Sequence, residues 1–91
     1  MKIISNLETT NEIKKIITTN ADQPSNVRIY IAGMGWSGPS FGLALDELKD
    51  EDLSYDFEGI NFVMEGFVHE QFGDFKVEYL GGGYMVSPVD Q

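Results

Sequence analysis

The sequence predicts a mainly β, α+β domain, and three observations support that class. Apolar residues alternate with polar or small residues over several short runs, a period of two that is typical of strands with one buried face. Only two segments have the spacing of an amphipathic helix. The 91 residues, 42% hydrophobic and 12% aromatic, suffice for one modest core, so we expect a single domain over residues 1–91.

An N-terminal helix is predicted over residues 9–19. Residues 5–8 and 9–12 each have the pattern of a capping box, in which a side-chain oxygen accepts a hydrogen bond from the first turn of a helix. The three isoleucines that follow, Ile13, Ile16 and Ile17, recur at the spacing of one helix face. The polar residues 20–26 are then expected to form a loop.

Six short strands are predicted after that loop, because larger apolar groups alternate with other residues in each of them. The runs are 27–31, 41–45, 53–57, 60–64, 75–79 and 84–86. Glu58 and Gly59 suit a tight hairpin turn between the third and fourth runs. Glycines 81–83 are expected to form a bend before the last strand.

A brief internal helix is predicted between the fourth and fifth strands. Met64, Phe67, Val68 and Phe72 have helical spacing. Gly73 suits the position just after a helix end, where glycine is the preferred residue.

The charge and cysteine content exclude several classes of function. The net charge of −9, from fifteen acidic and six basic residues, disfavours binding to nucleic acid or to an anionic membrane and suits a basic partner. With no cysteine, disulfides and thiolate chemistry are excluded. The N-terminal residues lack the apolar core of a signal peptide, and no apolar stretch approaches the roughly 18 residues of a membrane span. We therefore expect a cytoplasmic protein.

Residues 33–38 match G-x-G-x-x-G, the glycine pattern of dinucleotide-binding loops. A dinucleotide site needs a helix to begin at that loop, yet Pro39 and Ser40 lead into a period-two run. A nucleotide site is therefore not expected. The loop is still unusual, because it places the only tryptophan, Trp36, among small residues.

No catalytic or metal-binding group is predicted. The acidic residues of 46–56 begin like a calcium loop, but Tyr55 and Asn61 stand where such a loop needs glycine and glutamate, so we expect solvated acids. His69 is the only histidine and is expected on the surface. Ser37 has no evident base, and a small-ligand enzyme using the glycine loop would lack acid–base residues.

The run 27–47, with its loop Gly35-Trp36-Ser37-Gly38, resembles the core of the HesB-like family of A-type iron–sulfur cluster carriers. Residues 57–63 resemble the middle hairpin of that family, and 75–84 its penultimate strand and glycine-aromatic step. The resemblance implies small mixed β-sheets packed as a compact pseudo-barrel with helices outside. It also implies a role in iron–sulfur cluster assembly, with thiolate ligands in a G-C-S-G loop and a C-terminal C-G-C segment.

This sequence departs from the family at each of those ligands. Trp36 occupies the cysteine position of the loop, and residues 87–91 hold no cysteine. We therefore expect a monomer or weak homodimer without a cofactor, acting as a non-enzymatic accessory or interaction protein. Its expected binding residues are Gly35, Trp36, Ser37 and Gly38, with a protein as the partner.

Two alternatives stay open at Trp36. Some HesB-like proteins carry selenocysteine at this position, and the codons for Trp, Cys and selenocysteine differ by one base. The first alternative is therefore that the chain is a genuine carrier or redox protein whose natural residue 36 is cysteine or selenocysteine. Separately, the indole, with Met34 and Pro39 beside it, either forms an exposed contact patch or folds back to cover a gap left by the glycines.

Overall fold

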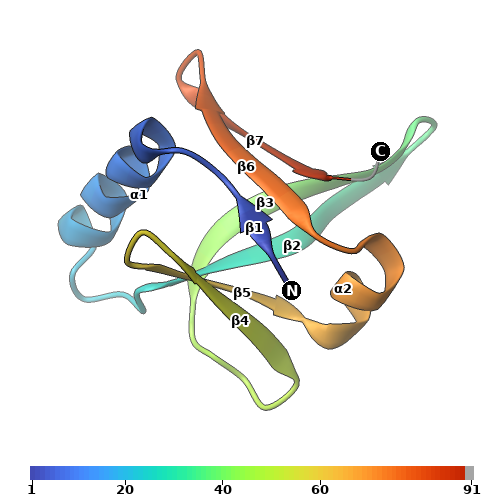
Figure 1. Ribbon diagram of the computed structural model, residues 1–91, viewed down its shortest axis with the longest axis horizontal. Helices are drawn as coiled ribbons and strands as arrows, with labels where there is room; N and C mark the ends of the chain where they lie inside the picture. Colours follow the sequence, from blue (N-terminus) through green and yellow to red (C-terminus); the bar gives the residue numbers. More distant parts are fainter. Residues whose placement is uncertain (90–91) are drawn as a thin grey trace.

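Two small mixed sheets and two helices make up the computed structural model, which describes residues 1–89 (Figure 1). The elements follow the chain in this order: β1 (Ile3–Ile4), α1 (Leu7–Thr19), β2 (Asn26–Gly35), β3 (Gly38–Asp46), β4 (Asp52–Phe57), β5 (Ile60–Glu65), α2 (Gly66–Phe72), β6 (Phe75–Leu80) and β7 (Gly83–Pro88). The prediction of a mainly β, α+β domain is confirmed.

Each sheet joins segments that are distant in the sequence. One has the strand order β1-β6-β7, with β1 parallel to β6 and β7 antiparallel to it. The other has the order β3-β2-β5-β4, with β2 parallel to β5 and antiparallel pairs on either side. The mixed sheets agree with the fold that the family resemblance implies.

Both sheets and both helices contribute to one core. Its buried apolar residues are Ile3, Ile13, Val27, Ile29, Ile60, Phe62, Met64, Val68, Phe75 and Val77. They come largely from the alternating runs that predict strands, since every second residue of such a run faces the same side. Figure 1 shows α1 and α2 at the outside of the sheets.

Helix α1 begins two residues before its predicted start. Asn6 is its N-cap, and the side-chain oxygen of Asn6 accepts a hydrogen bond from the backbone N–H of Thr9 at 2.8 Å. Neither predicted capping box therefore supplies the cap. The internal helix α2 ends as predicted, with Gly73 at a φ of 77°. Met64, expected at the start of that helix, lies instead in β5.

The β-hairpins differ in detail from their predicted bounds. Glu58 and Gly59 form the expected tight turn, with φ of 51° and 82°. Gly81 and Gly82 form a two-residue turn, because Leu80 pairs with Gly83 across it. The short strand β1 was not predicted at all.

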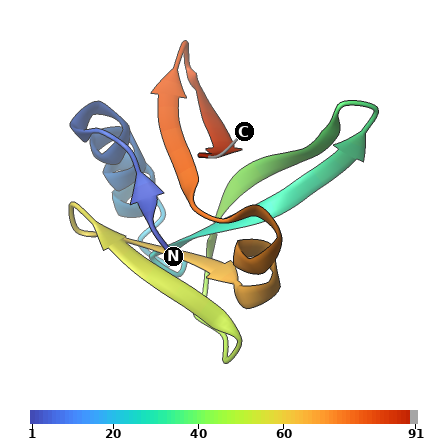
Figure 2. The same cartoon turned by 45° about the vertical axis from the view of Figure 1, so that its right-hand side comes forward.

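The largest difference is the length of the β2–β3 hairpin. Its strands extend to Gly35 and from Gly38, so most of the predicted loop over 33–38 is paired strand. The hairpin projects as an arm beyond the rest of the molecule, as Figure 2 shows. Within the described residues, neither helix is both long and apolar enough to cross a membrane.

Candidate contact site at the tip of the β2–β3 hairpin

The tip of the hairpin is a two-residue turn made by Trp36 and Ser37. Met34 pairs with Pro39, and Gly35 pairs with Gly38 directly below the turn. Gly38 has a φ of 105°, a backbone angle that residues other than glycine rarely adopt. The glycines that resemble a nucleotide loop therefore close a hairpin, and a strand rather than a helix follows them.

Trp36 extends fully into solvent from this turn. Its exposed fraction is 108% of the reference value, and that of Met34 on the adjoining strand is 76%. Trp36 therefore does not fold back over the glycines, so the covering alternative is wrong. All four residues predicted for binding, Gly35, Trp36, Ser37 and Gly38, lie together at the tip.

The arm is free of charge over its whole length beyond its base. No charged residue occurs between Arg28 and Asp46, although the chain has a net charge of −9. Contact surfaces between proteins are depleted of charge at their centre and enriched in Trp and Met. The composition of the arm thus matches a contact surface more closely than the rest of this acidic chain does.

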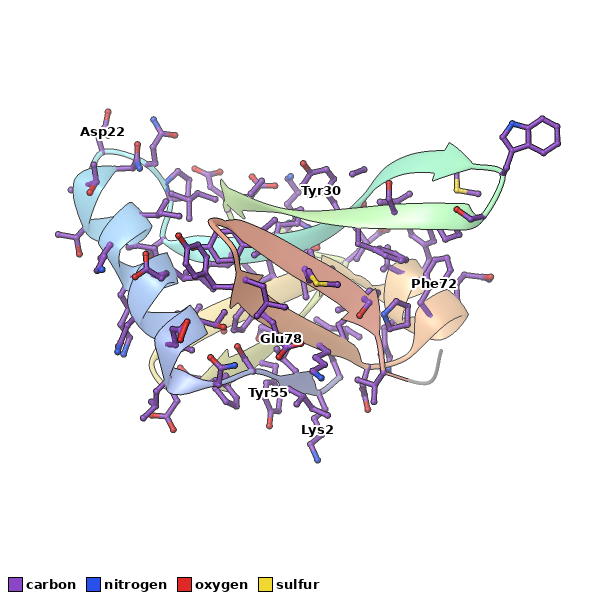
Figure 3. All side chains as sticks on the ribbon, turned by 90° about the horizontal axis from the view of Figure 1, so that it is seen from above. Lys2, Asp22, Tyr30, Tyr55, Phe72 and Glu78 are labelled. Atoms are coloured by element: carbon purple, nitrogen blue, oxygen red, sulfur yellow. The ribbon has the colours of Figure 1, made fainter. Side chains whose placement is uncertain are left out.

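Aromatic packing fixes the direction of the arm. The ring of Phe41 on β3 meets those of Phe72 and Phe75 edge to face, at centroid distances of 5.0 and 4.8 Å. Figure 3 shows Phe72 on α2, beside the ribbon of the arm. Such pairs stabilise beyond their buried area by about 0.5–1.5 kcal/mol, so these contacts hold the arm in place at Phe41, between its base and its tip.

A groove of about 440 Å³ runs beside the tip, between β3 and β7. Its lining is uncharged: Ser37, Pro39, Ser40, Phe41, Phe72, Tyr84, Met85, Val86, Ser87 and Pro88. Burial raises the pKa of the Tyr84 phenol above its ordinary value. The groove offers apolar surface and a few hydroxyl groups.

The residues at the tip do not fit an iron–sulfur cluster. Such clusters are held by thiolate sulfur, and the indole of Trp36 offers only an N–H donor. Ser37 and Ser40 offer neutral hydroxyls, and the sequence has no cysteine. Over residues 1–89 no three His, Asp or Glu side chains are grouped so as to hold a metal ion.

A buried ion-pair network lies at the base of the arm. The guanidinium of Arg28 donates hydrogen bonds to Asp46 at 2.7 Å and to Asp52 at 2.8 Å, and also to the backbone oxygen of Glu47. The bond to Asp52 raises the pKa of Arg28, and Arg28 in turn holds the pKa of Asp52 below its ordinary value. Hydrogen bonds from Lys49 and then from Arg28 lower the pKa of Asp46.

This network corrects the expectation that residues 46–56 are only solvated acids. The side chain of Asp52 is 1% exposed, and Arg28 satisfies it. Asp50 and Glu51 remain exposed, as predicted. Sequence reasoning missed Arg28 because its partners lie 18 and 24 residues further along the chain.

His69 lies apart from the tip. It is half-buried on α2, where Nδ1 lies 3.1 Å from the backbone oxygen of Gly73. Ser37 and His69 line different grooves. The structure thus does not bring Ser37 and His69 together as the nucleophile and base of a hydrolase site.

Both the sequence and the fold of the chain are similar to those of proteins named for iron–sulfur clusters. No family model matches the chain. Residues of the chain are 31% identical over 74 positions to the iron–sulfur cluster insertion protein ErpA of Actinobacillus succinogenes, and 30% identical over 73 to that of Mannheimia succiniciproducens. The matches cover 80% and 79% of this chain but only 58% of each relative. The chain thus spans less than two thirds of the length of these relatives.

Solved structures agree on the fold. Escherichia coli SufA, a protein involved in biosynthesis of iron–sulfur clusters, superimposes with a TM-score of 0.82 at 13% identity, covering 98% of this chain and 82% of SufA. IscA with a [2Fe-2S] cluster gives a TM-score of 0.72 at 18% identity, over 93% of this chain and 81% of IscA. At these identities the likeness establishes the fold alone.

Proposed function

The chain belongs to the HesB-like family of A-type carriers, and from this premise we propose that it is a non-enzymatic accessory protein that contacts a partner through the Trp36 tip. The partner is a protein of iron–sulfur cluster assembly, because the relatives are named as cluster insertion proteins. The protein acts as a monomer or weak homodimer, and the cluster is cargo that this chain does not itself ligate.

One observation carries the proposal: Trp36 is fully exposed at the hairpin tip, in the loop where the resemblance to the family implies a cysteine. A partner that covers the indole removes its apolar surface from water, which favours association. Tryptophan is also among the residues most enriched in the energetic centres of protein interfaces. Met34 beside it enlarges the apolar surface.

Affinity capture with quantitative mass spectrometry tests the proposal. Tagged wild-type protein is compared with Trp36→Ala and with the control Leu80→Ala, which removes another exposed apolar side chain, 53% exposed, at the far end of β6. We expect Trp36→Ala to lose iron–sulfur assembly proteins at least tenfold, as for a central interface residue, and Leu80→Ala to retain them. Equal recovery with both variants would contradict the proposal.

A second candidate function follows from the same position. Trp36 is fully exposed at a hairpin tip, so the fold is compatible with cysteine or selenocysteine there. A protein with either residue would be a carrier or redox protein with a nucleophilic group at position 36. Sequencing codon 36 of the gene, with mass spectrometry of the native protein, distinguishes the two functions: a selenium-containing or cysteine-containing mass supports the second.

A further inference from the structure

A second surface lies in the sheet of β4 and β5, and it combines exposed apolar groups with unpaired acids. A groove of about 480 Å³ lies between the start of β4 and the first turn of α2. Leu53 and Phe67 supply its apolar surface, with exposed fractions of 37% and 51%. No residue of the Trp36 tip lines it, so this groove is separate from the proposed contact site.

Backbone pairing holds the two sides of this groove in place. Leu53 pairs with Met64, and the next pair toward α2 is Asp52 with Glu65. The backbone N–H of Gly66, the first residue of α2, donates to the backbone oxygen of Glu51 at 3.1 Å. The groove is therefore preformed.

Three carboxylates surround the apolar centre. Glu51, Glu65 and Glu70 line the groove and are exposed. None of them forms an ion pair with any residue from 1 to 89. Arg28 and Lys49 line an adjoining groove with Glu51 and Glu65, but they bond to Asp46 and Asp52 instead.

We propose that this groove binds a basic segment of a partner protein, with one or two apolar side chains seated on Leu53 and Phe67 and flanking lysine or arginine residues paired with the glutamates. Charge complementarity determines this choice of occupant. A second copy of this chain also carries a net charge of −9 and would be repelled by the three carboxylates. The proposal does not depend on the function of the Trp36 tip.

Binding of three labelled synthetic peptides of equal length tests the proposal. The first contains lysine and leucine, the second replaces each lysine by glutamate, and the third replaces each leucine by serine. Fluorescence anisotropy should show binding of the first peptide, at least tenfold weaker binding of the other two, and weaker binding as salt increases. Equal binding of the lysine–serine peptide would mean only a diffuse charge attraction and would overturn the proposal.

Matched variants locate the binding. Phe67→Ser should weaken binding of the lysine–leucine peptide about tenfold, and Glu70→Gln about threefold, as expected for central and peripheral interface groups. Leu80→Ser, which also replaces an exposed apolar residue by serine, and Glu58→Gln lie outside the groove and should leave binding unchanged. Because Glu70 is exposed, Glu70→Gln should leave the protein folded even if Phe67→Ser does not. Equal loss in the control variants would overturn the site.

Sedimentation and amide shift mapping complete the test. We expect the amide signals of Leu53 and Phe67 to shift on addition of the lysine–leucine peptide. Without peptide, the wild-type protein and Phe67→Ser should sediment with the same molecular mass. If the wild-type chain sediments as a dimer that Phe67→Ser dissociates, the groove is an interface between copies and the proposal is wrong. Shifts confined to residues outside the groove would also overturn it.

Discussion

Arg28 ties β2 to the turn between β3 and β4 at the level of single residues. Its guanidinium makes four hydrogen bonds, two of them to the buried carboxylate of Asp52. Removing one partner of a buried pair leaves the other charge uncompensated, which is the costly case for buried ions. The network therefore stabilises the base of the arm as long as it stays complete.

Substitution of Asp52 should be the most damaging change in this network. We expect Asp52→Asn to lower the free energy of unfolding by about 2–3 kcal/mol, because Arg28 then remains buried without its main counterion. Asp46→Asn should have a smaller effect, since that side chain is 32% exposed. Asp50→Asn, at an exposed position, should change stability by less than about 0.5 kcal/mol. Urea denaturation at pH 7 measures all three; equal effects would contradict the role of Asp52.

The same network predicts an acid-sensitive stability. The pKa of Asp52 is lower in the folded protein than in the unfolded chain, where it is about 3.9. The stabilisation is thus fully present above that value and is lost as the pH falls below about 4. As the pH falls below about 4, the melting temperature of the wild-type protein should decrease more steeply than that of Asp52→Asn. Parallel pH profiles would contradict this assignment.

Trp36 should contribute little to folding because it contacts solvent only. We expect Trp36→Ala to change the free energy of unfolding by no more than about 0.5 kcal/mol, whereas a core aromatic would cost about 3–5. The wild-type protein should emit at the long wavelengths of water-exposed indole and be readily quenched by acrylamide. Blue-shifted, quencher-resistant emission together with a large stability loss would contradict the exposed position.

The sequence predicts which residues form the tip but not how they are presented. Trp36, flanked by glycines, could be identified as unusual, yet its exposure depends on the pairing of β2 with β3. Arg28 illustrates the opposite case. Its pairing with Asp52 depends on the turn over residues 47–51, and a local pattern shows only a run of acids, which is usually solvated.

At the scale of elements, α1 shows how a cap defines a helix start. Asn6 accepts a hydrogen bond from Thr9, and Thr9 in turn accepts one from the backbone N–H of Tyr79 at 2.9 Å. Because the pattern of a capping box is defined by Ser or Thr followed by Glu, the prediction began at residue 9 and missed the single Asn cap. The same residue, Thr9, also links α1 to β6.

Removal of the cap should destabilise the protein measurably. We expect Asn6→Ala to lower the free energy of unfolding by about 1 kcal/mol, since one N–H of the first turn loses its acceptor. Asn11→Ala, at an exposed position inside α1, should leave stability unchanged or slightly higher, because alanine favours helix. Denaturation of both variants provides the comparison. An equal or smaller loss for Asn6→Ala would contradict the capping role.

Two strand features could not be predicted from periodicity. β1 has only two residues, too few for any alternation, and it is recognisable only by its pairing with Phe75 and Lys76. The outer half of the arm contains Gly33, Gly35 and Pro39, which individually disfavour strands. Pairing across the hairpin nevertheless extends both strands to the tip, with a register shift between Ile31 and Gly33.

At the scale of the whole molecule, the alternating runs specify the fold class and most of the core. They do not specify the order of strands within each sheet, because β1 with β6 and β2 with β5 are parallel pairs of distant segments. The family resemblance implies small mixed sheets but not this strand order, which the structure provides, and the fold of SufA is similar. The departure at Trp36 then distinguishes this chain within its family.

Anaerobic reconstitution tests the central claim that this HesB-like chain presents a contact residue and holds no cluster of its own. The purified protein is incubated with ferrous iron and sulfide, desalted, and examined for visible absorption and for bound iron and sulfide. We predict a colourless protein without stoichiometric iron or sulfide, because residues 1–91 provide no thiolate. The account would be contradicted if a protein whose measured mass confirms tryptophan at position 36 stayed brown after desalting, with iron and sulfide in a fixed ratio.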